Sequence, residues 1–132
     1  IYRLLFKDNK SIHLEKFLDF PNLFSNEKLN QKWTELIKIR NICNISIEEK
    51  RANKEIGSSL EADLNIHLDK KLEEITKNID FSELCITSKA EISFKENLET
   101  SAQTTKAKGT KCGLCWKISE NACDRTHCPK NT

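Results

Sequence analysis

The residues with the clearest chemistry are cysteines near the end of the chain. Cys112 and Cys115 stand at CxxC spacing within the segment KCGLCW. This spacing lets two thiolates of one tight turn bind the same tetrahedral zinc ion at about 2.3 Å. Cys123, His127 and Cys128 follow and are candidates for the second pair of ligands. Four protein ligands leave no open position on the metal, so the sequence predicts a structural zinc site and not a catalytic one.

The spacing of the cysteines favours a metal site over disulfides. Four of the six cysteines crowd into the last 21 residues, whereas Cys43 and Cys85 stand alone. Three disulfides are typical of a small secreted protein, whereas clustered cysteines in the reducing cytoplasm more often bind metal. We therefore expect zinc as the cofactor and a cytoplasmic location. Cys43 and Cys85 are expected to be small buried side chains and not ligands.

Positive charge is concentrated in the same tail. Residues 1–100 hold 16 lysines and arginines against 18 acidic residues, and residues 101–132 hold 6 against 2. A basic tail attracts phosphate groups, which favours a nucleic-acid partner. No apolar run approaches the roughly 18 residues needed to cross a bilayer, so no membrane partner is expected. The chain begins with Ile1 and contains no methionine, as expected of a piece of a longer protein.

A long helix is expected upstream of the tail. Side chains on one helical face recur at steps of three and four, interrupted only by an arginine: Leu29, Trp33, Leu36, Arg40, Cys43 and Ile47. Ser25 or Asn26 is expected to cap its start, and the helix is expected to run to about Glu55. Gly57 is the predicted C′ residue that ends the helix.

The elements between helix and tail are expected to be short. The alternation of apolar and polar residues from Ala62 to Leu68 predicts a half-buried strand. The remaining elements are a short helix over 69–78, strands over 81–87 and 90–94 joined by a turn at Ser88 and Lys89, and a polar linker or exposed strand over 96–108. Gly109 opens the cysteine knuckle. The sequence thus predicts an α+β fold.

The charged residues of the long helix allow two interpretations. Its basic residues could contact a phosphate backbone; they are Lys38, Arg40, Lys50, Arg51 and Lys54. Alternatively they form a solvated face balanced by Glu35, Glu48, Glu49 and Glu55. The chain has only three glycines and no phosphate-cradling glycine-rich loop. Nothing in these patterns supports catalysis by the chain alone.

Several of these signals occur together, in the same order, in one known family. The helix carries Trp33, Leu36 and Arg40, continues through Glu48, Arg51 and Lys54, and is followed by the string IGSSLEA over 56–62. Together with KCGLCW in the tail, this order resembles the C-terminal end of bacterial-type isoleucyl-tRNA synthetases, which are class I aminoacyl-tRNA synthetases. The resemblance covers nearly the whole chain, most firmly residues 33–62 and 109–116.

The resemblance implies three parts. They are the C-terminal part of a helical anticodon-binding domain (1–56), an α+β junction (57–105) and a zinc-finger-like tail (106–132). The parent enzyme would attach isoleucine to its tRNA with ATP, as a monomer. The HIGH and KMSKS signatures of class I catalysis are absent from this sequence. ATP would therefore bind only in a catalytic domain that this chain lacks, and the chain would bind tRNA(Ile) and the rest of the synthetase without aminoacylating.

The resemblance also implies site residues. Cys112, Cys115 and Cys123 carry over as ligands of one structural zinc ion. The family has a second CxxC, but here Thr126 stands where its last cysteine would fall. Cys128 is the expected fourth ligand and His127 the runner-up. The expected tRNA contacts are Arg40, Arg51, Lys54, Lys108, Lys111, Trp116, Lys117 and Arg125. For Trp116, stacking on a base and covering the zinc site are both open.

Two other functions compete with this interpretation. A stand-alone zinc-ribbon module would bind duplex DNA without preference for one tRNA. A structural or interaction domain, in which zinc only stabilises a small core, would have negligible affinity for RNA.

Overall fold

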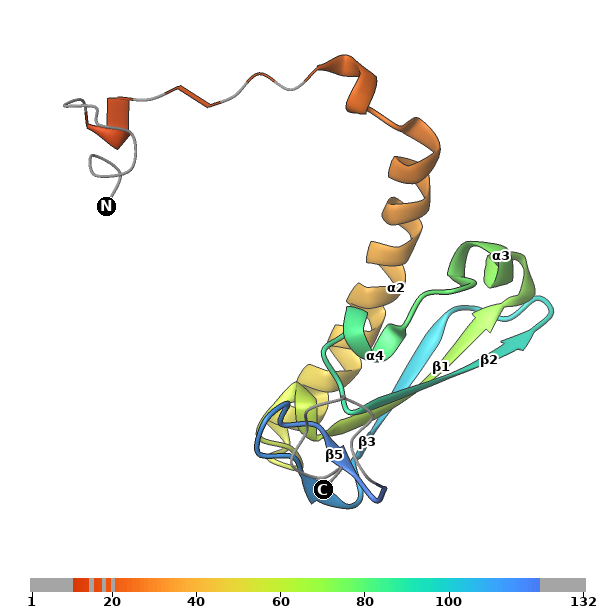
Figure 1. Ribbon diagram of the computed structural model, residues 1–132. Helices are drawn as coiled ribbons and strands as arrows, with labels where there is room; N and C mark the ends of the chain where they lie inside the picture. The colour runs from red at the N-terminus through yellow and green to blue at the C-terminus, as the bar shows by residue number, and fades with distance from the viewer. Residues whose placement is uncertain (1–10, 15, 18, 20, 122–132) are drawn as a thin grey trace.

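The computed structural model describes residues 11–14, 16, 17, 19 and 21–121 and confirms an α+β fold (Figure 1). The helices and strands are α2 (Glu27–Ala52), β1 (Ala62–Asp69), α3 (Glu73–Thr76), α4 (Phe81–Leu84), β2 (Lys89–Lys95), β3 (Ser101–Lys106), β4 (Thr110–Lys111) and β5 (Ile118–Ser119). Short 3₁₀ helices lie at Ile12–Leu14, Asn22–Phe24, Ser59–Glu61 and Lys70–Leu72. The last of these, together with α3, confirms the short helix predicted over 69–78.

The long helix α2 begins where the sequence predicts and ends slightly earlier. Asn26 is the N-cap, and its side-chain oxygen accepts a hydrogen bond from the Leu29 N–H at 3.0 Å. At the other end, the N–H of Lys54 donates to the oxygen of Arg51 at 2.9 Å, and the N–H of Glu55 donates to the oxygen of Lys50 at 3.0 Å. This pair of bonds is a Schellman motif, and its left-handed C′ residue is Lys54, with φ 58°.

The prediction that Gly57 ends the helix is therefore wrong. The helix is complete three residues before Gly57, because Lys54 accepts the left-handed conformation itself. Gly57 instead donates its N–H to the carboxylate of Glu61 at 2.9 Å, within the loop that leads into β1. This hydrogen bond joins the two ends of the loop between Gly57 and Glu61.

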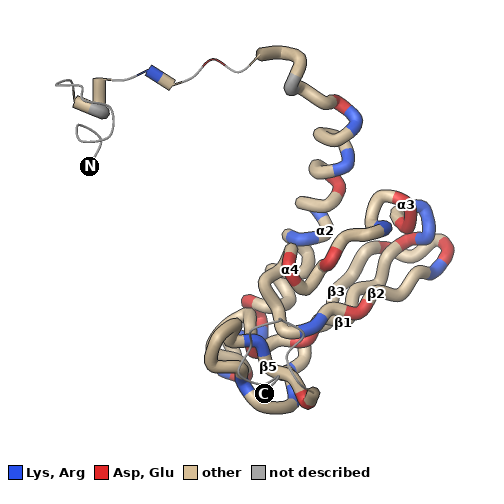
Figure 2. The backbone as a smooth tube through the Cα atoms, viewed as in Figure 1, with Lys and Arg blue, Asp and Glu red and all other residues tan. Residues whose placement is uncertain are grey.

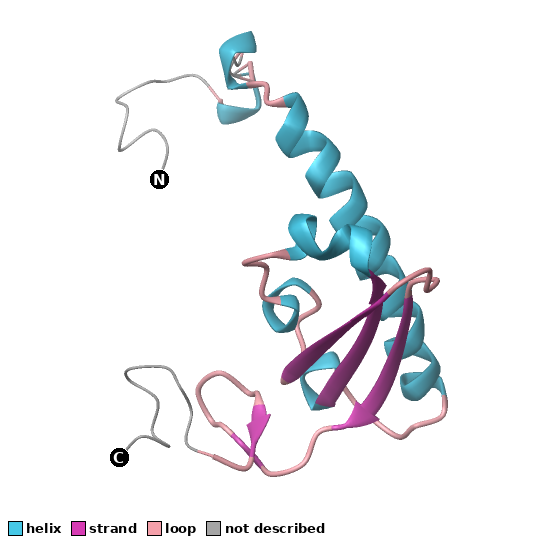
Figure 3. Ribbon diagram, turned by 90° about the vertical axis from the view of Figure 1, so that its right-hand side faces the viewer, coloured by secondary structure: helices cyan, strands magenta, loops and turns pink. Residues whose placement is uncertain are grey.

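A three-stranded sheet packs along α2, and the N-terminal part of the helix extends beyond the sheet (Figure 3). The strand order is β2-β1-β3, with β1 parallel to β2 and antiparallel to β3. Alternation in β1 is confirmed, since its buried residues are Ala62, Leu64, Ile66 and Leu68. These residues form one core with the buried face of α2, which consists of Leu36, Ile39, Cys43 and Ile47.

The strand predicted over 81–87 is wrong, because α4 occupies this stretch. Asp80 caps α4 by accepting a hydrogen bond from the Ser82 N–H at 2.8 Å, and Phe81 is buried beneath it. The predicted turn at Ser88 and Lys89 is also wrong, because Lys89 is the first residue of β2. Parallel strands need a long crossover between them, and α3 and α4 form that crossover between β1 and β2.

The polar stretch after β2 contains a true strand. β3 pairs with β1, placing Thr104 opposite Leu64. The hydroxyls of Thr104 and Ser46 lie 2.8 Å apart, which joins β3 to α2 by a hydrogen bond. Of the two alternatives for 96–108, the strand is therefore confirmed for Ser101–Lys106.

The prediction that the two isolated cysteines are buried is confirmed. Cys43 and Cys85 are both buried in the main core, 0% and 4% exposed. A hydrogen bond to Cys85, together with burial, raises the pKa of the Cys43 thiol well above its usual range. Cys43 therefore remains a neutral thiol, which suits a core residue and not a metal ligand.

Candidate metal knuckle and nucleic-acid interface

The cysteine segment forms a tight hairpin. β4 pairs with β5, with Thr110 opposite Ser119 and Lys111 opposite Ile118. Gly109 precedes β4 with φ 120°, and a Cβ at this position would lie 2.3 Å from the main chain of Ser119. No other residue could occupy this close approach without moving the partner strand. The prediction that Gly109 opens the knuckle thus has a steric basis.

The turn between β4 and β5 places Cys112 and Cys115 together. The N–H of Cys112 donates to the oxygen of Lys117, and the N–H of Trp116 donates to the oxygen of Cys112, both at 2.9 Å. Trp116 has φ 65°, the left-handed conformation that closes the turn. Cys112 is buried and Cys115, half-buried, packs against it. The turn therefore brings the two cysteines of the CxxC pair into contact.

The donor chemistry of this turn fits zinc. The N–H of Leu114 lies 3.4 Å from Sγ of Cys112 and donates to it. An N–H directed at sulfur stabilises the thiolate, which is the form that binds metal. Within residues 21–121 no group of three or more potential ligands comes together, and Cys112 and Cys115 would be two of the four ligands of the predicted zinc site. Cys123, His127, Cys128 and Arg125 lie outside the described residues.

The knuckle is hydrogen bonded to the rest of the fold. Nζ of Lys117 lies 2.8 Å from Oε1 of Glu83 and donates to the Ser82 hydroxyl at 3.3 Å. The N–H of Ile118 donates to Oγ of Ser88 at 2.6 Å, and that hydroxyl donates to the oxygen of Leu60 at 2.5 Å. These bonds join Lys117 to α4, and they join β5 through Ser88 to the 3₁₀ helix that precedes β1.

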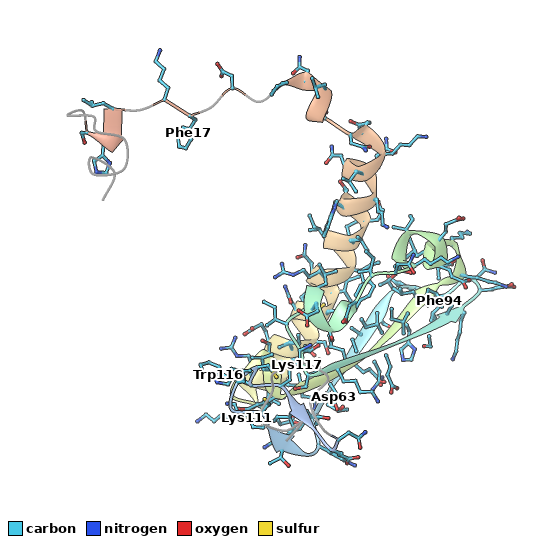
Figure 4. The ribbon with its side chains drawn as sticks, in the orientation of Figure 1. Phe17, Asp63, Phe94, Lys111, Trp116 and Lys117 are labelled. Atoms are coloured by element: carbon cyan, nitrogen blue, oxygen red, sulfur yellow. The ribbon has the colours of Figure 1, made fainter. Side chains whose placement is uncertain are left out.

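Trp116 and Lys111 form the exposed side of the knuckle. Trp116 is 59% exposed, and Nζ of Lys111 lies 5.7 Å from the centre of its ring. Figure 4 shows Lys111, Trp116 and Lys117 gathered at the same end of the molecule. An exposed indole beside a cation offers a flat surface and positive charge to an unpaired base. Stacking on a base and covering the zinc site both stay predictions for Trp116.

Three basic residues of α2 have an acidic partner nearby along the chain. Figure 2 shows both blue and red segments along the helix. The exposed ion pairs are Lys38–Glu35, Lys50–Glu55 and Arg51–Glu48, at 2.7, 2.9 and 2.8 Å. Arg40 is half-buried and donates through Nε to the oxygen of Leu84 at 2.9 Å. The ion pairs support a solvated, charge-balanced face for Lys38, Lys50 and Arg51. Lys54 is exposed and forms no ion pair within the described part of the chain.

Sequence reasoning missed Lys106. It is exposed on β3 and lines an open pocket of about 610 Å³ together with Arg51 and Lys54. Glu48, Glu55 and Glu61 line the same pocket. Lys106 belongs to a polar stretch with no periodic signal, and only the pairing of β3 with β1 brings it beside the end of α2. Lys108 and Lys111 continue the run of exposed lysines toward the knuckle.

Curated proteins similar to this chain agree with one another. An isoleucine--tRNA ligase of Pelagibacter ubique is 57% identical over 125 residues, which cover 95% of this chain and 14% of that protein. Isoleucine--tRNA ligases of Zymomonas mobilis and Bartonella henselae are each 32% identical, over 91% and 88% of this chain and 13% of theirs. The chain is homologous to a segment of isoleucine--tRNA ligases.

These matches confirm the resemblance to isoleucine--tRNA ligases. That the matching segment is the C-terminal end of the ligase stays a prediction. The chain spans only 13–14% of the length of these isoleucine--tRNA ligases. No protein-family model matches it. The three-part division also stays a prediction. No helix in the described part of the chain is long and apolar enough to cross a membrane.

Proposed function

We propose that this chain is the C-terminal segment of an isoleucine--tRNA ligase and binds the anticodon region of tRNA(Ile) in the cytoplasm. The whole enzyme would attach isoleucine to the tRNA with ATP, in a catalytic domain outside this chain. The observation that supports this function best is the exposed Trp116 with Lys111 beside it, on a chain homologous to these ligases. Bases in an anticodon loop are unpaired and can be stacked and read at their edges.

Zinc would have a structural role in this interface. Cys112 and Cys115 would hold it together with Cys123 and Cys128, or with His127 in place of Cys128. The ion would fix the turn that carries Trp116. All recognition chemistry would then come from the side chains of the chain itself.

Phosphate contacts would come from lysines near the knuckle and near the end of α2. Lys54, Lys106, Lys108 and Lys111 are exposed. Arg51 can exchange Glu48 for a phosphate, because an exposed ion pair is worth only about 0–1 kcal/mol. Arg40 uses Nε for Leu84, so its two terminal nitrogens could still reach a phosphate. Arg125 completes the predicted contacts.

The decisive experiment is a binding titration of the chain with tRNA(Ile) and a non-cognate tRNA. We expect preference for the cognate tRNA, and a loss of about tenfold in affinity for Trp116→Ala, because stacking on one base is worth about 1–3 kcal/mol. Trp33→Phe is the matched control, since Trp33 is a second exposed tryptophan, on α2, and is 43% exposed. Equal affinity for both tRNAs and for duplex DNA would favour the zinc-ribbon alternative. Negligible binding even at low salt would favour a structural domain.

A further inference from the structure

Lys117 has a different environment from the other lysines of the knuckle. Its side chain is 23% exposed, against 59% for the neighbouring Trp116. Two of its hydrogen-bonding positions are already used by Glu83 at 2.8 Å and Ser82 at 3.3 Å, both on α4. Asp80, the cap of α4, is a further negative charge near Lys117, whose positive charge contributes to lowering the pKa of the Asp80 carboxyl. A phosphate would therefore have to displace partners that belong to the chain.

The residue after Lys117 is held to the same part of the fold. The hydroxyl of Ser88 accepts from the Ile118 N–H at 2.6 Å and donates to the Leu60 oxygen at 2.5 Å. The N–H of Ser88 donates to the oxygen of Ala62 at 3.0 Å. Two consecutive residues of the knuckle are thus attached to α4 and to the beginning of β1.

The attachment lies directly beside the exposed indole. Trp116 directly precedes Lys117 and has a left-handed main chain, with φ 65°, and its N–H donates to the oxygen of Cys112 at 2.9 Å. The N–H of Cys112 bonds to the main-chain oxygen of Lys117 at 2.9 Å, so movement of Lys117 would be transmitted to both ends of the cysteine turn.

We propose that Lys117 is a positioning residue: its ion pair with Glu83 fixes the knuckle on α4 and so orients Trp116 and Lys111 toward the RNA. This inference rests on the proposed tRNA binding and assigns Lys117 a role different from the phosphate contact expected from the sequence. It also gives Glu83, an acidic residue, a favourable role in binding a polyanion.

A charge exchange separates the two roles. Lys117→Glu and Glu83→Lys should each weaken tRNA(Ile) binding by about fivefold to tenfold, and the double variant should restore it to within about twofold, as expected for a coupled pair. A phosphate contact predicts the opposite for Glu83→Lys, which would add positive charge and strengthen binding. Stronger binding by Glu83→Lys, or no rescue in the double variant, would overturn the proposal.

Salt dependence gives a second readout. Removing a phosphate contact lowers the slope of log affinity against log salt by about 1. Lys117→Gln should weaken binding and leave this slope unchanged. A slope lowered by about 1 would identify Lys117 as a phosphate contact. The matched control for the charge exchange is the Lys70–Glu96 ion pair, which is 3.3 Å long and lies at the opposite end of β1. Exchanging these two residues should leave the affinity for tRNA(Ile) unchanged.

A measurement without tRNA separates this inference from the proposed function. In a Trp33→Phe background, quenching of Trp116 fluorescence by acrylamide should change in both single variants and return to the parental value in the double variant. If wild-type chain fails to bind tRNA while this pattern holds, the proposed function is wrong but Lys117 still positions Trp116. If quenching is the same in all variants, the positioning role is wrong whatever the tRNA affinity.

Discussion

Arg40 and Leu84 are joined by a hydrogen bond between Nε of the guanidinium and the main-chain oxygen, 2.9 Å long and spanning 44 positions of the chain. Leu84 is the last residue of α4, and carbonyl oxygens at a helix end have no partner within the helix. Glu83, the preceding residue, pairs with Lys117. The short helix α4 thus connects α2 to the knuckle through two adjacent residues.

Replacing Arg40 should destabilise the chain. A hydrogen bond to a charged group contributes about 1.5–3 kcal/mol, and Arg40→Ala would leave the Leu84 oxygen without its donor. We expect a loss of about 1–2 kcal/mol in the free energy of unfolding, because Arg40 is only half-buried. Urea unfolding measures this loss. Lys38→Ala is the control on the exposed face, and an equal, small effect of both changes would contradict the structural role of Arg40.

Asp80 should make the stability of α4 dependent on acid pH. Hydrogen bonds from the Ser82 side chain and from the main chain of Ser82 and Glu83 lower the pKa of the Asp80 carboxyl. A lowered pKa means that the stabilisation is complete above the ordinary value of about 3.9 and is lost as the pH falls through the lower folded value. Asp80→Ala should cost about 1 kcal/mol at pH 7, as for other N-caps.

The control for this prediction is Asp80→Asn, which keeps a capping oxygen but cannot be protonated. Thermal melts from pH 7 to pH 2 should show a larger loss for the wild-type chain than for Asp80→Asn. Parallel pH profiles would show that Asp80 contributes nothing through its charge.

The fourth zinc ligand can be assigned by substitution. Cys112→Ser and Cys115→Ser should each reduce the zinc content of the purified chain well below one ion, because two of the four proposed ligands would come from this turn. Cys128→Ser should do the same, whereas His127→Gln should retain zinc. The reverse result for the last two variants would make His127 the ligand. Cys43→Ser is the control, since its thiol is buried in the separate main core.

The lysines near the end of α2 should contribute to the salt dependence of tRNA binding. Lys54→Gln and Lys106→Gln should each lower the slope of log affinity against log salt by about 1, with similar losses on all tRNAs. Lys71→Gln, at the opposite end of β1, serves as the control. Unchanged slopes in both variants would remove the pocket beside α2 from the interface.

Strong periodic patterns were enough to predict the two main elements of the fold. The buried face of α2 follows a helical period from Leu36 to Ile47, and β1 alternates over its full length. The first turns of the predicted helical face are not buried, because Leu29 and Trp33 are 49% and 43% exposed. The stretch from Phe81 to Thr87 is too short for its period to distinguish helix from strand. Asp80 with Glu83 three residues later was the available signal for a helix start, and it outweighs the apolar run.

The sequence by itself determined the relationship to isoleucine--tRNA ligases, the cysteine pair at CxxC spacing and the basic tail, because these depend on residue types and local spacing. Only the tertiary structure decided which basic groups stay available. Charge in the sequence does not reveal its partner: Arg40 finds a carbonyl oxygen of α4, Lys117 finds Glu83, and Lys106 is brought beside Lys54 by strand pairing. These contacts join residues distant along the chain, and packing of α2, α4 and the sheet around one core determines them.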